Sequence, residues 1–139
     1  MELTLVIKLR DSFSGVLYGL QKGAGSDYIT LQKQEGGSAI LAFTCEVTCK
    51  QAGAGLNFLG PFCQGTPKER FVYLDIGTYS SIKDSISGGR LKIPLYGFSP
   101  EFISEIKQGS ILQTSVSALG KGGRPAYGTV KPFEGWSLV

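Results

Sequence analysis

Residues 2–10 alternate between apolar and polar side chains, with Val6 as the one apolar residue on the polar face. A period of two is typical of a β-strand with one face in a core and the other in water, and a one-residue slip would exchange the two faces. This pattern constrains the fold more than any other feature of the chain. The apolar face would carry Leu3, Leu5, Ile7 and Leu9. The polar face would carry Glu2, Thr4, Lys8 and Arg10.

Composition extends this prediction to the whole chain. Its 139 residues include 42% hydrophobic residues and 20 glycines, and only 18% are charged. Short runs rich in Val, Ile, Thr, Phe and Tyr between glycines are typical of all-β proteins. We therefore predict one domain over residues 1–139. Its fold would be an antiparallel β-sandwich or a partly open β-barrel of about eight strands, with one short α-helix packed across an open end.

Further strands are predicted wherever alternation or a β-branched run recurs. Residues 71–76 have apolar side chains on both faces, which indicates a central strand, whereas Pro94 favours an edge or a bulge in the segment that contains it. The glycine-rich residues 51–57 are not expected to pack, and residues 58–64 would form at most a bent edge segment. The remaining predicted strands are 16–21, 28–34, 40–50, 90–96, 111–119, 126–131 and 135–139.

One helix is well marked. Ser99 is a suitable N-cap, Pro100 fits the first helical position, and Gly109 would end a helix of about ten residues. An apolar stripe of Phe102, Ile103 and Ile106 would face the sheet. The glycine-rich residues 120–124 are predicted to form a hairpin turn.

Charge and composition exclude several functions. A net charge of +3 is too small and too dispersed for non-specific nucleic-acid binding, and no apolar run is long enough to span a membrane. We expect a cytoplasmic protein. The chain has no His, which removes the commonest general base and the usual zinc and iron sites. We expect no metal and no cofactor.

The three cysteines do not form a secreted disulfide framework. Cys45 and Cys49 would lie on the core face of the predicted strand 40–50, too far apart along a strand to form a disulfide. Core filling is the favoured role for both. Cys63 follows a Gly-Pro-Phe sequence, but no neighbouring base is evident, so a reactive role is the weaker alternative.

Eight short motifs stand out along the chain: GSDY (25–28), LQKQ (31–34), NFLGPF (57–62), QG (64–65), RFVYLDIGTY (70–79), RLKIPL (90–95), TVKP (129–132) and GW (135–136). Together they are similar to those of a family of small, uncharacterised bacterial proteins classed as a domain of unknown function. The resemblance covers nearly the whole chain and implies a bacterial single-domain protein without identifying catalytic residues. The family has Val where this chain has Cys63, which argues against a shared nucleophilic role.

A polar cluster around Asp75 is the leading candidate site. Asp75 lies on the aromatic face of a predicted central strand, where a carboxylate needs a partner that Arg90 or Lys92 could supply. A cross-strand ion pair is the simpler interpretation, and a polar cluster at the mouth of a pocket is the functional one. The candidate ligand-binding set is Phe58, Phe62, Gln64, Arg70, Tyr73, Asp75, Tyr79, Arg90 and Lys92.

Three functions remain open. The first is a non-enzymatic binding module for a small polar or anionic ligand or an extended peptide. The second is a cofactor-independent enzyme that uses Asp75 as acid or base. The third is an assembly subunit, such as the protomer of a homo-oligomer, that pairs through a sheet edge. Three glycine-rich loops contain Lys or Arg, at residues 22–25, 88–90 and 121–124. They are better explained as turns than as phosphate-binding loops, because none of them connects a strand to the start of a helix.

Overall fold

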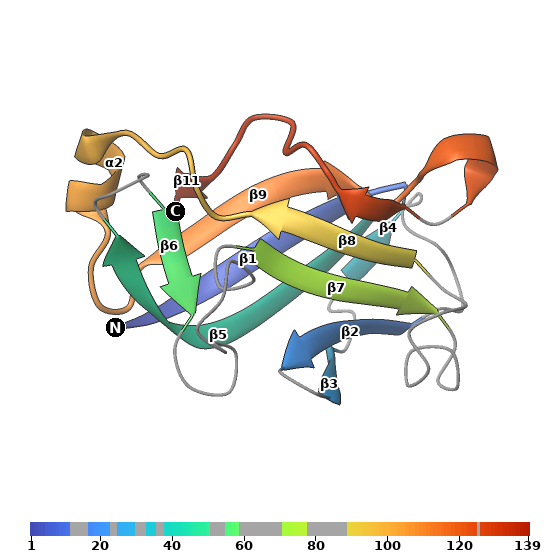
Figure 1. The fold of residues 1–139 in the computed structure, drawn as a ribbon, viewed down its shortest axis with the longest axis horizontal. Helices are drawn as coiled ribbons and strands as arrows, with labels where there is room; N and C mark the ends of the chain where they lie inside the picture. The colour runs from blue at the N-terminus through green and yellow to red at the C-terminus, as the bar shows by residue number, and fades with distance from the viewer. Residues whose placement is uncertain are drawn as a thin grey trace.

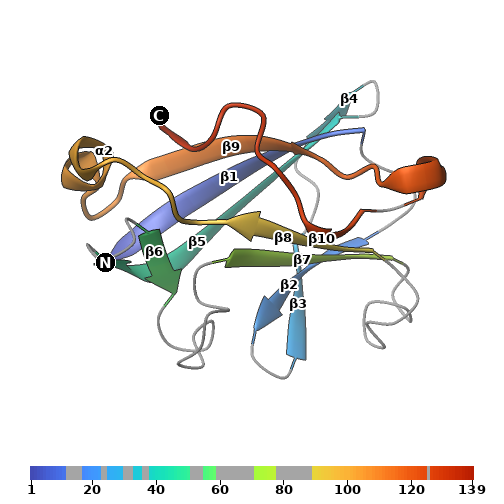
Figure 2. The ribbon, with the colours of Figure 1, turned by 45° about the horizontal axis from the view of Figure 1, so that its top comes forward.

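The chain folds into two β-sheets that face each other as layers (Figures 1 and 2). The computed structural model describes residues 1–11, 17–22, 25–29, 33–35, 38–50, 55–58, 71–77, 89–124 and 126–139. Within these residues the structure is mostly strand, with one short α-helix. The all-β, sandwich-like prediction is therefore confirmed, and the described strands do not close into a barrel.

The first sheet has six strands in the order β11-β9-β1-β5-β4, and β6 also pairs with β5. The predicted first strand is confirmed as β1, which lies at the centre of this sheet. β1 is antiparallel to β5, with Leu5 opposite Phe43, and parallel to β9, with Leu5 opposite Leu112. The strands are β1 (Glu2–Arg10), β4 (Lys33–Glu35), β5 (Ser38–Lys50), β6 (Gly55–Phe58), β9 (Ile111–Ser117) and β11 (Ser137–Leu138).

The second sheet has five strands in the order β10-β8-β7-β2-β3. β7 lies at its centre, antiparallel to both β2 and β8, which confirms the prediction of a central strand over residues 71–76. β8 and β10 run parallel. The strands are β2 (Leu17–Lys22), β3 (Gly25–Ile29), β7 (Phe71–Gly77), β8 (Gly89–Pro94) and β10 (Tyr127–Thr129).

The core lies between the two sheets, and strands of both sheets contribute buried apolar residues to it. Leu3, Leu5, Ile7 and Leu9 of β1 are fully buried, and Leu41, Cys45 and Val47 of β5 are buried as predicted. Phe43 is only partly buried against the core, and the side chain of Cys49 lies outside the described residues. The second sheet contributes Val72, Leu74, Leu91, Ile93 and Leu95.

The sheets are mixed rather than antiparallel, and the structure describes eleven strands rather than about eight. β1 and β9 can pair in parallel because strands of the second sheet come between them in the sequence, and β8 and β10 can do so because β9 of the first sheet comes between them. Residues 28–34 were predicted as one strand but contribute to β3 and β4, which lie in different sheets. Alternation indicates extended backbone and does not identify the partner strand.

Two local predictions about strands are wrong. Residues 51–57 are not excluded from packing, because β6 begins at Gly55 and Leu56 is fully buried, with its N–H donating to the Leu95 carbonyl at 2.7 Å. Pro94 does not mark an edge, since β8 is paired on both sides. Pro94 is the last residue of β8. The hydrogen-bond ladder ends there, so the missing N–H of proline does not interrupt it.

The helix α2 (Pro100–Glu105) begins as predicted and ends early. Ser99 caps it by accepting a hydrogen bond from the Phe102 N–H at 3.1 Å. Ile106 is already extended and buried, and the N–H of Gly109 donates to the Glu2 carbonyl at 2.9 Å. Attachment to β1 therefore ends the helix after six residues instead of about ten.

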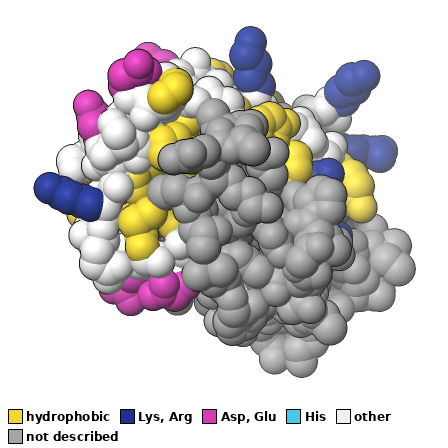
Figure 3. All heavy atoms as spheres, turned by 60° about the vertical axis from the view of Figure 1, so that its left-hand side comes forward, with side chains coloured by type: hydrophobic (Ala, Val, Ile, Leu, Met, Phe, Trp, Pro, Cys, Tyr) yellow, Lys and Arg dark blue, Asp and Glu magenta, His cyan; other side chains and the backbone are white. Residues whose placement is uncertain are grey.

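The end of the sandwich that carries α2 has a mixed surface. Figure 3 shows hydrophobic side chains reaching the surface there, with acidic side chains near the upper and lower margins. Lys121–Gly123 form a 3-10 turn, η3, between β9 and β10. Because these strands lie in different sheets, the predicted hairpin over residues 120–124 is wrong.

Candidate functional site

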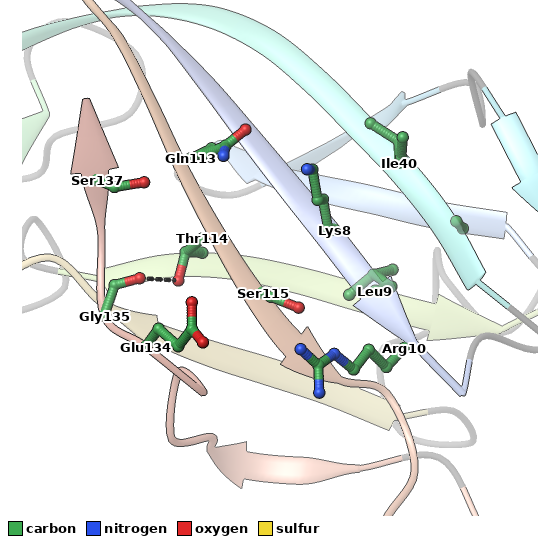
Figure 4. Close-up of a pocket in the computed structure, with 11 residues that line it drawn as sticks. Lys8, Leu9, Arg10, Ile40, Gln113, Thr114, Ser115, Glu134, Gly135 and Ser137 are labelled. Carbon is green, nitrogen blue, oxygen red and sulfur yellow. Dashed lines mark hydrogen bonds between the residues drawn. The ribbon is translucent and has the colours of Figure 1, made fainter. Parts of the chain in front are cut away.

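A pocket of about 430 Å³ lies on the outer face of the first sheet, away from the core (Figure 4). We call it the charged pocket. Its polar lining comes from β1, from β9 and from the segment that leads into β11. These side chains are Lys8, Arg10, Gln113, Ser115, Glu134 and Ser137.

Alternation along β1 and β9 places four of these side chains on the same face. Leu9 and Thr114 are buried toward the core, so their neighbours in sequence point outward. The parallel register sets Lys8 directly opposite Ser115, and the antiparallel register sets Ile40 of β5 on its other side. A cation, a hydroxyl group and an apolar patch therefore lie side by side.

Residues 130–136 form a strap that runs from β10 in the second sheet to β11 in the first sheet and carries Glu134 to the pocket. The Phe133 N–H donates to the Ser115 carbonyl at 2.9 Å, and the Thr114 hydroxyl donates to the Gly135 carbonyl at 2.8 Å. Gly135 has a φ of +71°, a conformation that favours glycine. These two bonds on either side of Glu134 determine where its backbone lies.

Arg10 is held by an aromatic ring. Its guanidinium carbon lies 4.2 Å from the centre of the Phe133 ring. A cation over a ring uses the face of the guanidinium and leaves the N–H donors at its edge available. In Figure 4 the Arg10 and Glu134 side chains reach toward the area around Ser115 from different sides. Among the described residues, neither Lys8 nor Arg10 forms an ion pair with a carboxylate.

The charged pocket thus combines two cations, one carboxylate, two hydroxyl groups and an amide. Lys and Arg bind carboxylate or phosphate groups, and the guanidinium can do so through two parallel hydrogen bonds. Glu134 accepts hydrogen bonds and favours a neighbouring ammonium or hydroxyl group. The lining therefore suits a small molecule with an anionic group next to a hydrogen-bond donor.

The cluster predicted around Asp75 lies elsewhere, on the outer face of the second sheet. Register sets Tyr73 opposite Lys92 and Asp75 opposite Arg90. The ammonium of Lys92 lies 4.9 Å from the centre of the Phe71 ring and 5.8 Å from that of Tyr73. Burial raises the pKa of Tyr73 above its usual value, against the opposing effect of the Arg90 charge.

Three members of the predicted set, Tyr73, Arg90 and Lys92, therefore gather on two neighbouring strands. Asp75 joins them by register, but its side chain lies outside the described residues, as does that of Phe58. The pairing of the Asp75 carboxylate thus stays a prediction. The other predicted residues, Phe62, Gln64, Arg70 and Tyr79, lie outside the described part of the chain, as does Cys63.

Comparison with known protein families identifies the chain. A model described as a family of unknown function (DUF5990) matches residues 3–139. The chain belongs to this family. The match confirms the resemblance to a domain of unknown function. Comparison with curated proteins and with solved structures gives no match.

The DUF5990 match carries no site assignment, so the charged pocket rests on the structure. None of the six polar residues of this pocket belongs to the ligand-binding set predicted from the sequence. The alternation of β1 placed Lys8 and Arg10 on the solvent face, and that was the available signal. The pairing of β1 with β9, and the strap that carries Glu134 to the pocket, have no local sequence signature. In the described part of the chain, no helix is long and apolar enough to cross a membrane.

Proposed function

We propose that this protein is a non-enzymatic binding module for a small polar molecule with an anionic group, held in the charged pocket. The observation that carries the proposal is the position of Lys8 and Arg10. Both line a concave surface beside Ser115, and neither forms an ion pair with a carboxylate among the described residues. A bound anion would supply that partner.

Size and preorganisation support the proposal. The pocket volume of about 430 Å³ falls in the range of small-molecule sites. Arg10 is already held against Phe133, and the strap is tied to β9 on both sides of Glu134. Less side-chain entropy is then lost when a ligand binds.

Glu134 narrows the class of ligand. A carboxylate in the lining disfavours polyanions and favours a ligand that carries an ammonium or hydroxyl group near its anion. Amino acids and hydroxy acids have this arrangement. We place the function in the bacterial cytoplasm, and the buried Cys45 thiol is compatible with that setting.

Thermal unfolding of the wild-type protein with a defined panel tests the proposal. The panel is glycine, glutamate, lactate, acetate and inorganic phosphate. For each compound that shifts the unfolding midpoint, calorimetry then measures the dissociation constant. A ligand at about one hundred times its dissociation constant stabilises the folded state by about 2.7 kcal/mol. We expect an amino or hydroxy acid to give the largest shift, and acetate and phosphate to give less.

Matched variants identify the site. Arg10→Gln and Lys8→Gln should each weaken binding about tenfold or more, because each removes a charge-assisted hydrogen bond. Lys107→Gln removes the same charge from an exposed residue outside the pocket and should have no effect. Glu134→Gln should lower the preference for amino acids over acetate. A panel without any response, or equal losses in Lys107→Gln and Arg10→Gln, would contradict the proposal.

A further inference from the structure

A second hollow, of about 390 Å³, lies where the end of β8, the helix α2 and the strap meet. We call it the aromatic groove. It is a separate site from the charged pocket, and the two linings share only Gly135. Its apolar lining is Pro94, Tyr96, Phe98, Phe102, Pro132 and Trp136.

The floor and one wall of the aromatic groove are firmly held. Trp136 is only 8% exposed, and its indole N–H donates to the Pro94 carbonyl at 2.7 Å. The rings of Phe98 and Phe102 lie 5.0 Å apart and pack against the core. Tyr96 is 44% exposed, so part of this aromatic surface faces water.

The aromatic surface continues along the outer face of the second sheet. The Tyr96 ring meets the Phe71 ring edge to face, with centres 5.5 Å apart. Phe71 in turn lies beneath the ammonium of Lys92, at 4.9 Å. A chain that leaves the aromatic groove along β8 would therefore pass from apolar rings to a cation.

Among the described residues, the charged side chain that lines the aromatic groove is basic. Lys131 lines it, and Lys92 lies on the neighbouring strand, since parallel register sets Thr129 opposite Lys92. Among the described residues, neither lysine forms an ion pair with a carboxylate. The acidic residues of α2, Glu101 and Glu105, do not line the groove. A bound segment with carboxylates would be drawn toward the two lysines.

We propose that the aromatic groove binds an extended, acidic peptide segment that contains proline. Aromatic-lined grooves receive polyproline II segments, whose restricted backbone loses little entropy on binding. Proline also suits the apolar lining of this groove, because a proline nitrogen carries no N–H that would need a hydrogen-bond acceptor there. Acidic residues beside the proline would meet Lys131 and Lys92.

A peptide fits these rings better than a nucleic acid does. Base stacking needs open ring faces, but Phe71 meets Tyr73 and Tyr96 edge to face and has Lys92 over its own face. The net charge of +3 also gives a weak field for a polyanion.

Fluorescence anisotropy with three labelled decapeptides tests the partner chemistry. The first alternates Glu and Pro, the second replaces Glu with Lys, and the third replaces Pro with Ala. We expect the Glu-Pro peptide to bind at least about tenfold more tightly than either of the others, because each replacement removes one of the two recognised features. Emission from Trp136, the only tryptophan of the chain, should change on binding.

Two matched pairs of variants locate the site. Lys131→Glu should weaken binding of the Glu-Pro peptide about tenfold or more, whereas Lys121→Glu makes the same change on η3 and should not. Tyr96→Ala should also weaken binding of the Glu-Pro peptide. Its control is Tyr127→Ala, which removes a tyrosine of β10 that is 71% exposed and should not weaken binding. Circular dichroism checks that each variant folds.

The inference fails if the folded wild type does not bind the Glu-Pro peptide, or if controls and test variants lose affinity equally. Tighter binding of a labelled ten-nucleotide oligothymidine would assign the surface to nucleic acid instead. Arg10→Gln should leave peptide affinity unchanged, which separates this inference from the proposed function.

Discussion

At the scale of single residues, both outer faces hold a cation against an aromatic ring. Arg10 lies over Phe133 at 4.2 Å, and Lys92 lies over Phe71 at 4.9 Å. A ring holds a cation in place without neutralising it, whereas a carboxylate would do both. Each cation therefore keeps its charge available to a ligand. This is the physical basis on which both proposed sites favour anions.

Tyr73 gives a pH-dependent prediction. Burial raises its pKa in the folded state, so its protonated form is favoured by folding. This contribution is fully present below the unfolded pKa, which is about 10, and is lost as pH rises through the folded value. Wild-type stability should therefore fall more steeply above about pH 10 than that of Tyr73→Phe. Urea unfolding at intervals between about pH 9 and 11 measures both slopes, and parallel slopes would contradict the assignment.

At the scale of elements, the strap depends on a few hydrogen bonds to β9. Thr114 is buried, and its hydroxyl donates to the Gly135 carbonyl. Thr114→Val keeps the shape of the side chain but leaves that carbonyl without its donor, so we expect a loss of about 1–3 kcal/mol in the free energy of unfolding. Thr129→Val, on an exposed position of β10, should change it by less than about 0.5 kcal/mol.

The same variant tests whether the strap positions Glu134. If it does, Thr114→Val should also weaken binding of the panel ligand in the charged pocket, measured by calorimetry at a temperature where the variant is folded. A destabilised variant with wild-type affinity would show that Glu134 is positioned independently of this bond.

Elements with a strong local pattern could be predicted from the sequence. The strands β1 and β5 were predicted from the alternation of apolar and polar residues, and β7 from apolar residues on both of its faces. The Ser99 cap was predicted because capping depends on neighbouring residues. The prediction failed for β6, where Leu56 is buried by partners distant in sequence, and for the end of α2, which is determined by a bond from Gly109 to β1.

At the scale of the whole molecule, strand order was not predictable. Lys8 and Ser115 become neighbours because β1 and β9 pair in parallel after the chain has built strands of the second sheet. No local pattern carries that information. The neighbours within the predicted cluster were easier to predict, because β7 and β8 are consecutive in the second sheet and pair antiparallel, which brings Tyr73 and Lys92 together.

The two sheets share one core, and this gives a last prediction. Leu5 in the first sheet and Leu91 in the second are both fully buried in the same hydrophobic cluster. Leu5→Ala and Leu91→Ala should each lower the free energy of unfolding by about 2–5 kcal/mol, because each leaves a cavity between the layers. Leu119→Ala, at a position 45% exposed, should cost much less.

Both core variants should shift one common transition. Far-ultraviolet circular dichroism reports on all strands, and the emission of Trp136 reports on the contact between the strap and the Pro94 carbonyl at the end of β8. If the sheets stabilise each other through the shared core, the two probes give coincident urea transitions in wild type and in both variants. A variant in which Trp136 keeps its wild-type midpoint while the dichroism transition moves would show that the layers unfold separately.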